Sequence, residues 1–204
     1  MEEVEIIGHV GTYVRAIRMA CEEKNIPHRV TEVLPRSPEA YRVHPFGKVP
    51  ALRHAGFELC ESKAIATYLD RTFPQAPLIP TEPRLEALTE QWVSLVNSVI
   101  DRTMIREYVL SYVFPRGPNG TPDRAVIDAA MPALEQQIAA LERAVTPTGF
   151  LVADRFTFAD INLMPILALV QAYPEGQQAL AAAPQLRAYF ARHAERASFR
   201  KTAR

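Results

Sequence analysis

The sequence predicts an α/β domain followed by an all-helical domain. Up to about residue 80, short β-branched segments alternate with helical patterns. A segment with three prolines in nine residues, Gln75 to Pro83, then interrupts the chain. Beyond it, apolar residues recur only at helical spacing. We therefore place the first domain at residues 1–80 and the all-helical domain at residues 81–204.

In the first domain the predicted order is strand, helix, strand, helix, strand, strand, helix. Ser37 and Pro38 supply an N-cap and a first-turn proline, and Gly56 can supply the positive φ of a hairpin turn. The expected elements are 4–8, 13–23, 28–33, a short helix after Ser37, 49–53, 57–60, and a helix from residue 62 that ends before Pro74. A parallel strand–helix–strand start followed by a hairpin predicts a small mixed sheet with helices packed on it.

In the second domain we expect four helices. Their ranges are 85–114, 123–145, 161–172 and 185–195, with a loop at 115–122. Pro132 is expected to kink the second of these helices. Thr157 and Asp160 have the spacing of a capping box, and Phe156 and Ile161 have that of a hydrophobic staple. The mostly apolar helix that follows should form the centre of this domain.

Composition argues against several function classes, although local basic patches remain possible. Lys plus Arg and Asp plus Glu number 23 each, so no basic surplus favours nucleic acid or an anionic membrane as a partner. No apolar run approaches the ~20 residues that span a bilayer, and the acidic start at residues 1–5 lacks the apolar core of a signal peptide. Only Cys21 and Cys60 occur, which favours a cytoplasmic protein without disulfides.

The Val49-Pro50 step stands at a strand start. An X-Pro bond can be cis at a cost of only about 0.5–1 kcal/mol, and a cis proline here would turn the backbone of Val49 outward to pair with an extended peptide. An ordinary trans proline is the alternative. The neighbouring Lys48 is either a partner for a ligand carboxylate or a solvated surface lysine.

Glu61 and Ser62 stand at a helix start. The first N–H groups of a helix are unpaired and carry partial positive charge, so they attract a carboxylate, to which Ser62 can add a hydrogen bond. Glu61 can pair with an ammonium group of the same ligand. The pair therefore suits an α-amino acid head group, and a plain N-cap is the alternative. Together with Lys48 and Val49, it describes a site for a tripeptide-like ligand.

These residues resemble a known family. HPFGKVPAL at residues 44–52, followed by ESKAIATYL at 61–69, is similar to the glutathione-binding half of cytosolic glutathione transferases. Residues 16–24 resemble the first helix of that family, and residues 156–161 resemble the cap of its central helix. The resemblance covers essentially the whole chain.

The resemblance implies a fold and an activity. It implies a thioredoxin-like N-terminal domain, an all-α C-terminal domain and a homodimer. It also implies glutathione as co-substrate, a small hydrophobic electrophile as acceptor, and no cofactor or metal. In this family the glutathione thiolate attacks the electrophile. Because a free thiol has a pKa of about 8.5, ionisation near neutral pH needs a downward shift of about two units, or about 2.7 kcal/mol.

The chain departs from its bacterial-type, serine-containing relatives at the start of the first helix. These relatives usually read Ser-Pro, and this chain has Gly11 and Thr12 there. We expect Thr12 to be the catalytic donor to the thiolate, with a simple N-cap as the alternative. Tyr13 is expected to line the acceptor pocket or to pack, and His9 to be structural.

Tyr108, on the first long helix of the second domain, is expected to contact the acceptor, with a core or dimer-interface position as the alternative. Two other functions stay open. The missing serine favours a non-catalytic glutathione-binding protein of the same fold. A glutathione-dependent peroxidase or reductase is the third, although residues 9–13 contain no cysteine for a mixed disulfide.

Overall fold

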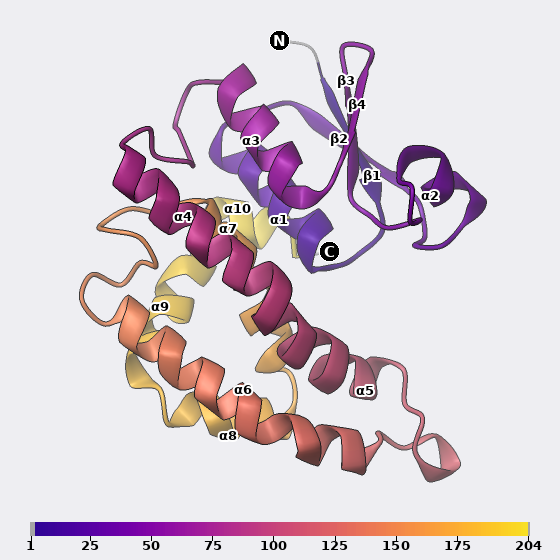
Figure 1. The fold of residues 1–204 in the computed structure, drawn as a ribbon, viewed down its shortest axis with the longest axis vertical. Coiled ribbons are helices and arrows are strands. Elements are labelled where there is room, and N and C mark those ends of the chain that lie inside the picture. Colours follow the sequence, from indigo (N-terminus) through magenta and orange to yellow (C-terminus); the bar gives the residue numbers. More distant parts are fainter. Residues whose placement is uncertain (1–2, 204) are drawn as a thin grey trace. The chain divides into compact units, whose positions relative to one another are not determined.

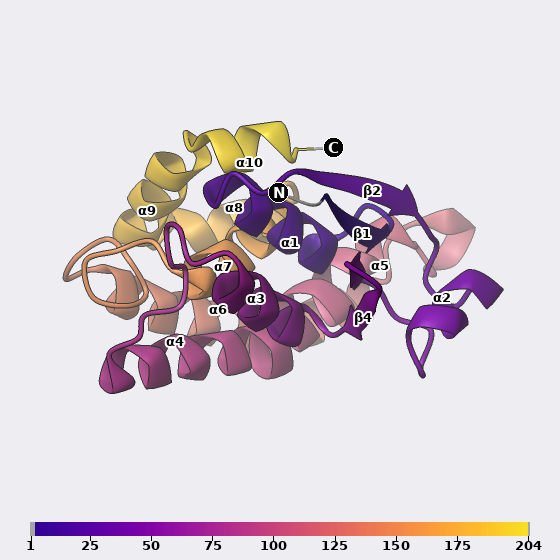
Figure 2. The ribbon, with the colours of Figure 1, turned by 90° about the horizontal axis from the view of Figure 1, so that it is seen from above.

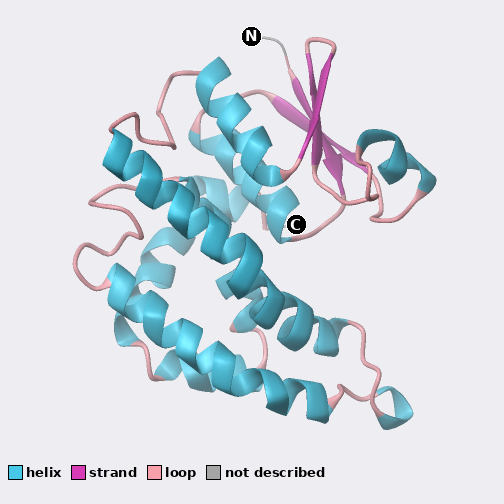
Figure 3. Cartoon of the chain, in the orientation of Figure 1, coloured by secondary structure: helices cyan, strands magenta, loops and turns pink. Residues whose placement is uncertain are grey.

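The computed structural model describes residues 3–203, so Met1 and Glu2, the first two residues of the acidic start, lie outside it, as does Arg204. The chain divides into two compact units: unit 1 comprises residues 3–81 and 194–203, and unit 2 comprises residues 82–193. Within the described residues all named strands belong to unit 1 (Figure 3). Unit 2 is helical apart from one isolated bridge between Val152 and Arg155. The predicted fold class, a mixed α/β part and an all-helical part, is confirmed.

Unit 1 contains a four-stranded mixed sheet in the order β2-β1-β3-β4. The strands are β1 (Val4–Gly8), β2 (His28–Glu32), β3 (Ala51–His54) and β4 (Phe57–Cys60). β2 runs parallel to β1, whereas β3 runs antiparallel to both β1 and β4. Ala55 and Gly56 join β3 to β4, and both have positive φ, as a two-residue hairpin turn requires.

Three helices complete the N-terminal part of unit 1. They are α1 (Thr12–Glu23), α2 (Pro38–Val43) and α3 (Ser62–Thr72). Ser37 caps α2 by accepting a hydrogen bond from the Ala40 N–H, as predicted. α1 and α3 lie side by side, with α1 against β1 and α3 against β3 and β4 (Figure 1). Ile6, Ile17 and Leu52 are among the fully buried side chains of this core.

A buried ion pair joins the ends of α1 and α3 to the proline-rich segment. Lys24 Nζ lies 2.9 Å from Asp70 Oδ1, and the two side chains are only 1% and 6% exposed. Lys24 also donates to the carbonyls of residues 75–76, and Asp70 accepts from the N–H groups of residues 78–79. The segment that the sequence marks as a stiff linker is therefore held by two charged side chains of unit 1.

The last described residues return to unit 1. Helix α10 (Ala197–Lys201) packs against α1 (Figure 2). Arg196 makes two hydrogen bonds to the Glu23 carboxylate, at 2.8 and 2.6 Å. Arg15 donates to the carbonyl oxygen of Phe199 and covers its ring. Our prediction assigned all residues after 80 to the helical domain; in the structure residues 194–203 pack with the first unit.

Unit 2 is built from helices. A continuous helical run comprises α4 (Pro83–Leu95), the π-helical η1 (Val96–Val109) and α5 (Leu110–Val113). The 3-10 turn η2 (Pro118–Gly120), α6 (Arg124–Val145), α7 (Phe158–Val170), α8 (Pro174–Ala181) and α9 (Pro184–Ala194) follow. α6 continues through Pro132. No helix in the described part of the chain is long and apolar enough to cross a bilayer.

The buried helix α7 is the centre of unit 2, as its apolar sequence predicts. Thr157 and Asp160 form the predicted capping box, and the Thr157 N–H donates to Asp160 at 2.8 Å. Asp160 also accepts from the Leu151 N–H and the Tyr189 hydroxyl. Burial nevertheless raises the pKa of Asp160.

A polar cluster joins η1, α5 and α6 to the start of α8. The hydroxyls of Tyr108 and Tyr112 both donate to the Glu175 carboxylate, at 3.2 and 2.6 Å, and Arg124 donates to it at 2.6 Å. Tyr108 also accepts the Gly176 N–H at 2.7 Å. Burial alone would raise the pKa of Glu175, but the hydrogen bonds from Tyr112 and Arg124 outweigh it and lower the pKa to about 2.

This cluster predicts an acid-dependent contribution to stability. The carboxyl pKa of Glu175 lies below its ordinary value of 4.5, so the stabilisation is present above about pH 4.5 and is lost as the pH falls towards 2. We expect Glu175→Gln to lower the free energy of unfolding at pH 7. We also expect the free energy of unfolding of this variant to fall less between pH 4.5 and 2 than that of wild type. Urea unfolding across that pH range measures the difference. Parallel acid profiles for the two proteins would contradict this assignment.

Candidate functional site

Three chain segments meet at one end of the unit 1 sheet. Ile7, near the end of β1, pairs with Ala51 at the start of β3, and Ala51 pairs with Cys60 at the end of β4. The start of α1 follows β1, the Val49-Pro50 step precedes β3, and the start of α3 follows β4. The topology therefore gathers at this end the three features that the sequence singles out in the first domain.

Gly8 lets α1 and the Val49 segment approach the end of β1 closely. A Cβ atom added there would lie 2.6 Å from a Val14 methyl carbon and 3.3 Å from Val49 Cβ. Both contacts are tighter than ordinary van der Waals packing. A side chain at residue 8 would push α1 and the Val49 segment apart. Gly8 is thus required for this close packing, a constraint that the sequence alone did not reveal.

The Val49-Pro50 peptide bond is cis. Pro50 is buried and Val49 is half-buried. No hydrogen bond joins the Val49 backbone to any other residue between 3 and 203. Lys48, beside it, is exposed and has no ion pair with a described carboxylate. These groups are available to a ligand lying along this edge.

Glu61 is held in an unusual geometry just before α3. Its φ is 71° and its ψ is 117°, a left-handed backbone that costs a non-glycine residue of the order of 1–3 kcal/mol. The side chain is 63% exposed, and its Oε1 atom lies 3.1 Å from Nε2 of the buried His44. Because His44 Nδ1 accepts the Phe46 N–H at 3.0 Å, the ring proton lies on Nε2 and is donated to Glu61.

His44 is therefore a positioning residue for Glu61, with a role that our sequence reasoning did not assign. Its place in the HPFGKVPAL segment was visible in the sequence, but nothing there shows that its ring reaches residue 61. The hydrogen bond still leaves acceptor capacity on the exposed Glu61 carboxylate. That capacity suits a ligand ammonium group.

Ser62 is the first residue of α3. The first hydrogen bond of the helix runs from the Ile65 N–H to the Glu61 carbonyl, so the Ser62 N–H has no partner within the helix. The residue is only 6% exposed, yet its hydroxyl makes no hydrogen bond with another described residue. An unpaired hydroxyl beside an unpaired helix start can bind a carboxylate.

The start of α1 offers a second set of donors. Gly11 is the N-cap residue and has no side chain to cap the helix, so the N-cap alternative for Thr12 does not describe this structure. Thr12 is buried at 8% exposure, and its hydroxyl has no hydrogen-bond partner among residues 3–203. Tyr13 is half-buried on the same turn. An anion placed here would meet the positive end of α1 together with the Thr12 hydroxyl.

Two other residues considered from the sequence have structural partners. The His9 ring lies 3.0 Å from an exposed Glu32 oxygen. Tyr108 has no exposed surface, and its hydroxyl bonds to Gly176 and Glu175 within unit 2. This burial favours the core alternative for Tyr108, and its predicted contact with an acceptor gains no support. Nor do any three His, Cys, Asp or Glu side chains of residues 3–203 form a group that could hold a metal ion.

Comparison with known proteins yields two family matches. Residues 10–72 match the model of the glutathione S-transferase N-terminal domain, and residues 100–197 match the model of the glutathione S-transferase C-terminal domain. The two matches contain every candidate site residue discussed above except Gly8 and His9. They fall on the two parts of the chain in the order that the sequence predicts.

Individual relatives agree with these matches. Glutathione S-transferase 1 of Zea mays is 28% identical over 178 residues, or 82% of this chain and 78% of that protein. The Stringent starvation protein A homolog of Haemophilus ducreyi is 24% identical over 165 residues, or 76% and 68% of the two chains. The crystal structure of glutathione transferase F7 from Populus trichocarpa has the same fold, with a TM-score of 0.88 at 22% identity over 98% of this chain and 97% of that one.

Proposed function

Because the chain belongs to the glutathione S-transferase family, we propose that it binds glutathione at this end of the unit 1 sheet and conjugates it, through its sulfur, to a small hydrophobic electrophile. The observation that carries the proposal is the convergence of two helix starts and the free Val49 backbone. Glutathione acts as co-substrate, and no separate cofactor is needed.

The groups in the site match the charges of glutathione. The amino-acid head of glutathione places its carboxylate at Ser62 and the start of α3, and its ammonium at Glu61. The backbone of its cysteine residue pairs with Val49, and its terminal carboxylate lies near Lys48. The thiol then lies towards Thr12 at the start of α1.

Thr12 and the helix start can supply the stabilisation that the thiolate needs. A helix N-terminus contributes up to ~2 kcal/mol, and a hydrogen bond to a charged group ~1.5–3 kcal/mol. Their sum covers the roughly 2.7 kcal/mol that corresponds to two pKa units. The thiolate sulfur forms a bond to the electrophilic carbon, and the displaced electron pair leaves with the leaving group or moves into the acceptor.

Retention on immobilised glutathione tests the binding site. We expect the wild-type protein to bind the resin, and both Glu61→Ala and Ser62→Ala to weaken binding about tenfold, the effect of losing one charge-assisted contact. Lys63→Ala, on the exposed neighbouring residue, is the matched control and should bind normally. If the Glu61 and Ser62 variants bind as well as wild type, the ligand is held elsewhere.

A second candidate is a glutathione-binding protein without turnover. Gly11 favours it, because the serine expected at this place is missing. One of the relatives is named as a stringent starvation protein and not as a transferase. Retention on glutathione without turnover of any electrophile in a broad panel would identify this alternative. The absence of cysteine at residues 9–13 argues against a glutathione-dependent reductase.

We also propose that the protein is a homodimer. Leu88, Leu95 and Val99 are 42%, 37% and 47% exposed, and their spacing places them along one side of α4 and η1. Such an apolar row suits a symmetric contact between two copies. Light scattering should give twice the chain mass of 22.8 kDa for wild type and one chain mass for Leu95→Glu. Val126→Glu, at a similarly exposed site on α6, should stay dimeric.

The cysteines support a cytoplasmic location. Cys21 and Cys60 are both free. Burial raises the pKa of the Cys21 thiol to about 12, so this thiol stays protonated and unreactive. A protein without disulfides needs no oxidising compartment.

A further inference from the structure

We propose that His44 makes ligand binding at the unit 1 site pH-dependent, so that a ligand bound at neutral pH is released as the pH falls. The inference rests on the proposed glutathione site and concerns its regulation. The His44 side chain is buried, and the residue is only 3% exposed. Its ring contacts Glu61, just before α3, through Nε2, and it contacts the turn at residues 44–47 through Nδ1.

Only the neutral ring of His44 satisfies both contacts. Nδ1 accepts the Phe46 N–H at 3.0 Å, and Nε2 donates to Glu61 Oε1 at 3.1 Å. A protonated imidazole has an N–H donor at each nitrogen. The proton added at Nδ1 would face the Phe46 N–H, so this hydrogen bond is lost when the ring becomes charged.

The turn at residues 44–47 leads directly into the segment proposed to bind the ligand. The Gly47 N–H donates to the His44 carbonyl at 2.9 Å, and Gly47 has a positive φ of 60°. Lys48 and the cis Val49-Pro50 step come next in the chain. Loss of the Phe46 hydrogen bond therefore loosens the turn that places the Val49 backbone.

Protonation of His44 also changes what Glu61 offers to a ligand. The Glu61 side chain is 63% exposed and is proposed to hold the ligand ammonium group. A charged ring would form an ion pair with the same carboxylate, so the added proton and the ammonium compete for it. Because such coupling is reciprocal, acid weakens ligand binding, and ligand binding expels the proton. Histidine is the side chain whose charge ordinarily changes between pH 5 and 8.

Glu61 is the only charged side chain among residues 3–203 that pairs with the His44 ring. The Phe46 ring lies beside it, with 6.1 Å between the ring centroids. Other ionisable side chains of the surrounding elements make no hydrogen bond or ion pair with His44: Glu39, Tyr41 and Arg42 from α2, Lys48 from the following loop, and Glu58 and Cys60 from β4. The pH dependence is therefore assigned to His44 acting on Glu61 and on its own turn.

Titration calorimetry with S-methylglutathione between pH 8 and 5 tests the proposal, because this ligand has no thiol to ionise. We expect the dissociation constant of wild type to rise about tenfold as the pH falls, the effect of weakening one charge-assisted contact. At pH 6 binding should release protons, so the measured enthalpy should vary with the ionisation enthalpy of the buffer.

Two non-titrating variants isolate His44. In His44→Asn the amide oxygen can still accept the Phe46 N–H, as asparagine does in turns. In His44→Gln the amide nitrogen can still donate to Glu61. For both variants the dissociation constant should change less than twofold over the same pH range, without proton release. His28→Asn, at the start of β2 and so at the opposite end of the sheet, is the matched control and should behave as wild type.

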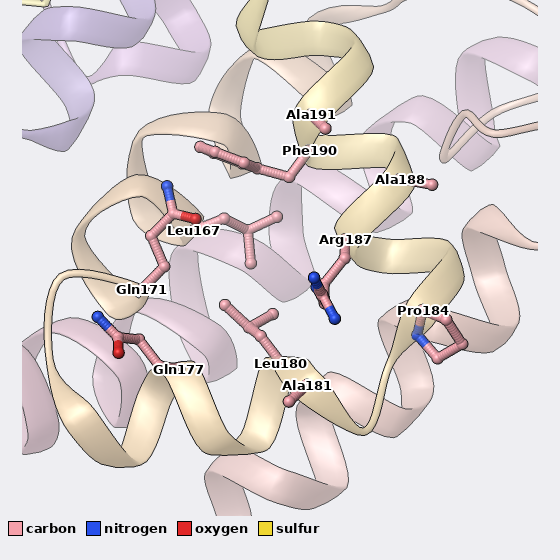
Figure 4. Close-up of a pocket in the computed structure, with 10 residues that line it drawn as sticks. All are labelled: Leu167, Gln171, Gln177, Leu180, Ala181, Pro184, Arg187, Ala188, Phe190 and Ala191. Carbon is pink, nitrogen blue, oxygen red and sulfur yellow. The ribbon is translucent and has the colours of Figure 1, made fainter.

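Two further comparisons locate the effect. N-acetyl-S-methylglutathione, which lacks the ammonium group, should bind more weakly and vary less with pH than the parent ligand. Weak binding in the apolar pocket of unit 2 would not vary over this range (Figure 4), because among its lining residues, which all lie between 167 and 191, Arg187 alone is ionisable.

The proposal is overturned if wild type binds S-methylglutathione equally well at pH 8 and pH 5. Equal pH dependence in wild type and the two His44 variants would overturn it as well. Absence of binding at every pH would overturn the glutathione site itself, and this inference with it.

Discussion

Replacing Asp70 by alanine is expected to lower the free energy of unfolding by about 3–5 kcal/mol, because breaking a buried ion pair leaves an uncompensated charge. The side chains of Lys24 and Asp70 are almost completely buried. Without Asp70, two backbone N–H groups of residues 78–79 also lose their acceptor. Urea unfolding followed by circular dichroism measures the change.

Two comparisons make this prediction specific. Glu3→Ala removes a partner of Arg29 from a half-exposed ion pair, and we expect it to cost less than about 1 kcal/mol. The double variant Lys24→Met with Asp70→Leu should be less destabilised than the sum of its single changes, since no lone buried charge remains. A loss below about 1 kcal/mol for Asp70→Ala would show that the pair contributes little.

Replacing Thr12 by alanine is expected to raise the pKa of the bound glutathione thiol by about one to two units. This is the effect of removing a ~1.5–3 kcal/mol hydrogen bond to the thiolate. The value of kcat/KM below the new pKa should fall about tenfold to a hundredfold, because less thiolate is present. Ultraviolet absorbance of the bound thiolate against pH measures the shift directly.

Two variants separate Thr12 from its neighbours. Thr12→Ser keeps a hydroxyl and should keep a pKa near that of wild type, which a purely packing role would not predict. Tyr13→Phe removes the neighbouring phenol and should shift the pKa less than Thr12→Ala. The reverse order would assign the thiolate contact to Tyr13.

Local signals in the sequence were sufficient for most of the fold. The capping box at Thr157, the cap at Ser37 and the hairpin turn at Gly56 each depend on neighbouring residues, and all three are present. Helices α8 and α10 were not predicted, because they are only eight and five residues long and give little periodicity to detect. The helical pattern over 85–114 predicts a helix through η1 but not its π-helical form, because apolar spacing alone does not distinguish a π-helix from an α-helix.

For the candidate site, the sequence indicated which segments could bind a ligand, but it did not indicate all the side-chain hydrogen bonds between them. Glu61, Ser62 and Val49 lie on segments that β-pairing brings to one end of the sheet. The parallel strand–helix–strand start and the hairpin were predictable, but the pairing of β1 with β3 was not. The His44–Glu61 hydrogen bond joins residues 17 positions apart, and side-chain reach across such a gap has no local signature. The hydroxyl of Tyr108 accepts a hydrogen bond from Gly176 of the unpredicted helix α8, a partner that a spacing argument could not reveal.

The return of the chain to unit 1 affects how the protein is made. Residues 8–62 carry the proposed glutathione site, whereas Arg196 and Phe199, which hold α1 through Glu23 and Arg15, are synthesised more than 130 residues later. During translation α1 is therefore made well before Arg196 and Phe199, the two residues that hold it. Unit 1, which carries the proposed glutathione site, is synthesised first but completed last. A nascent chain that stops before α10 would expose the α1 surface that this helix covers.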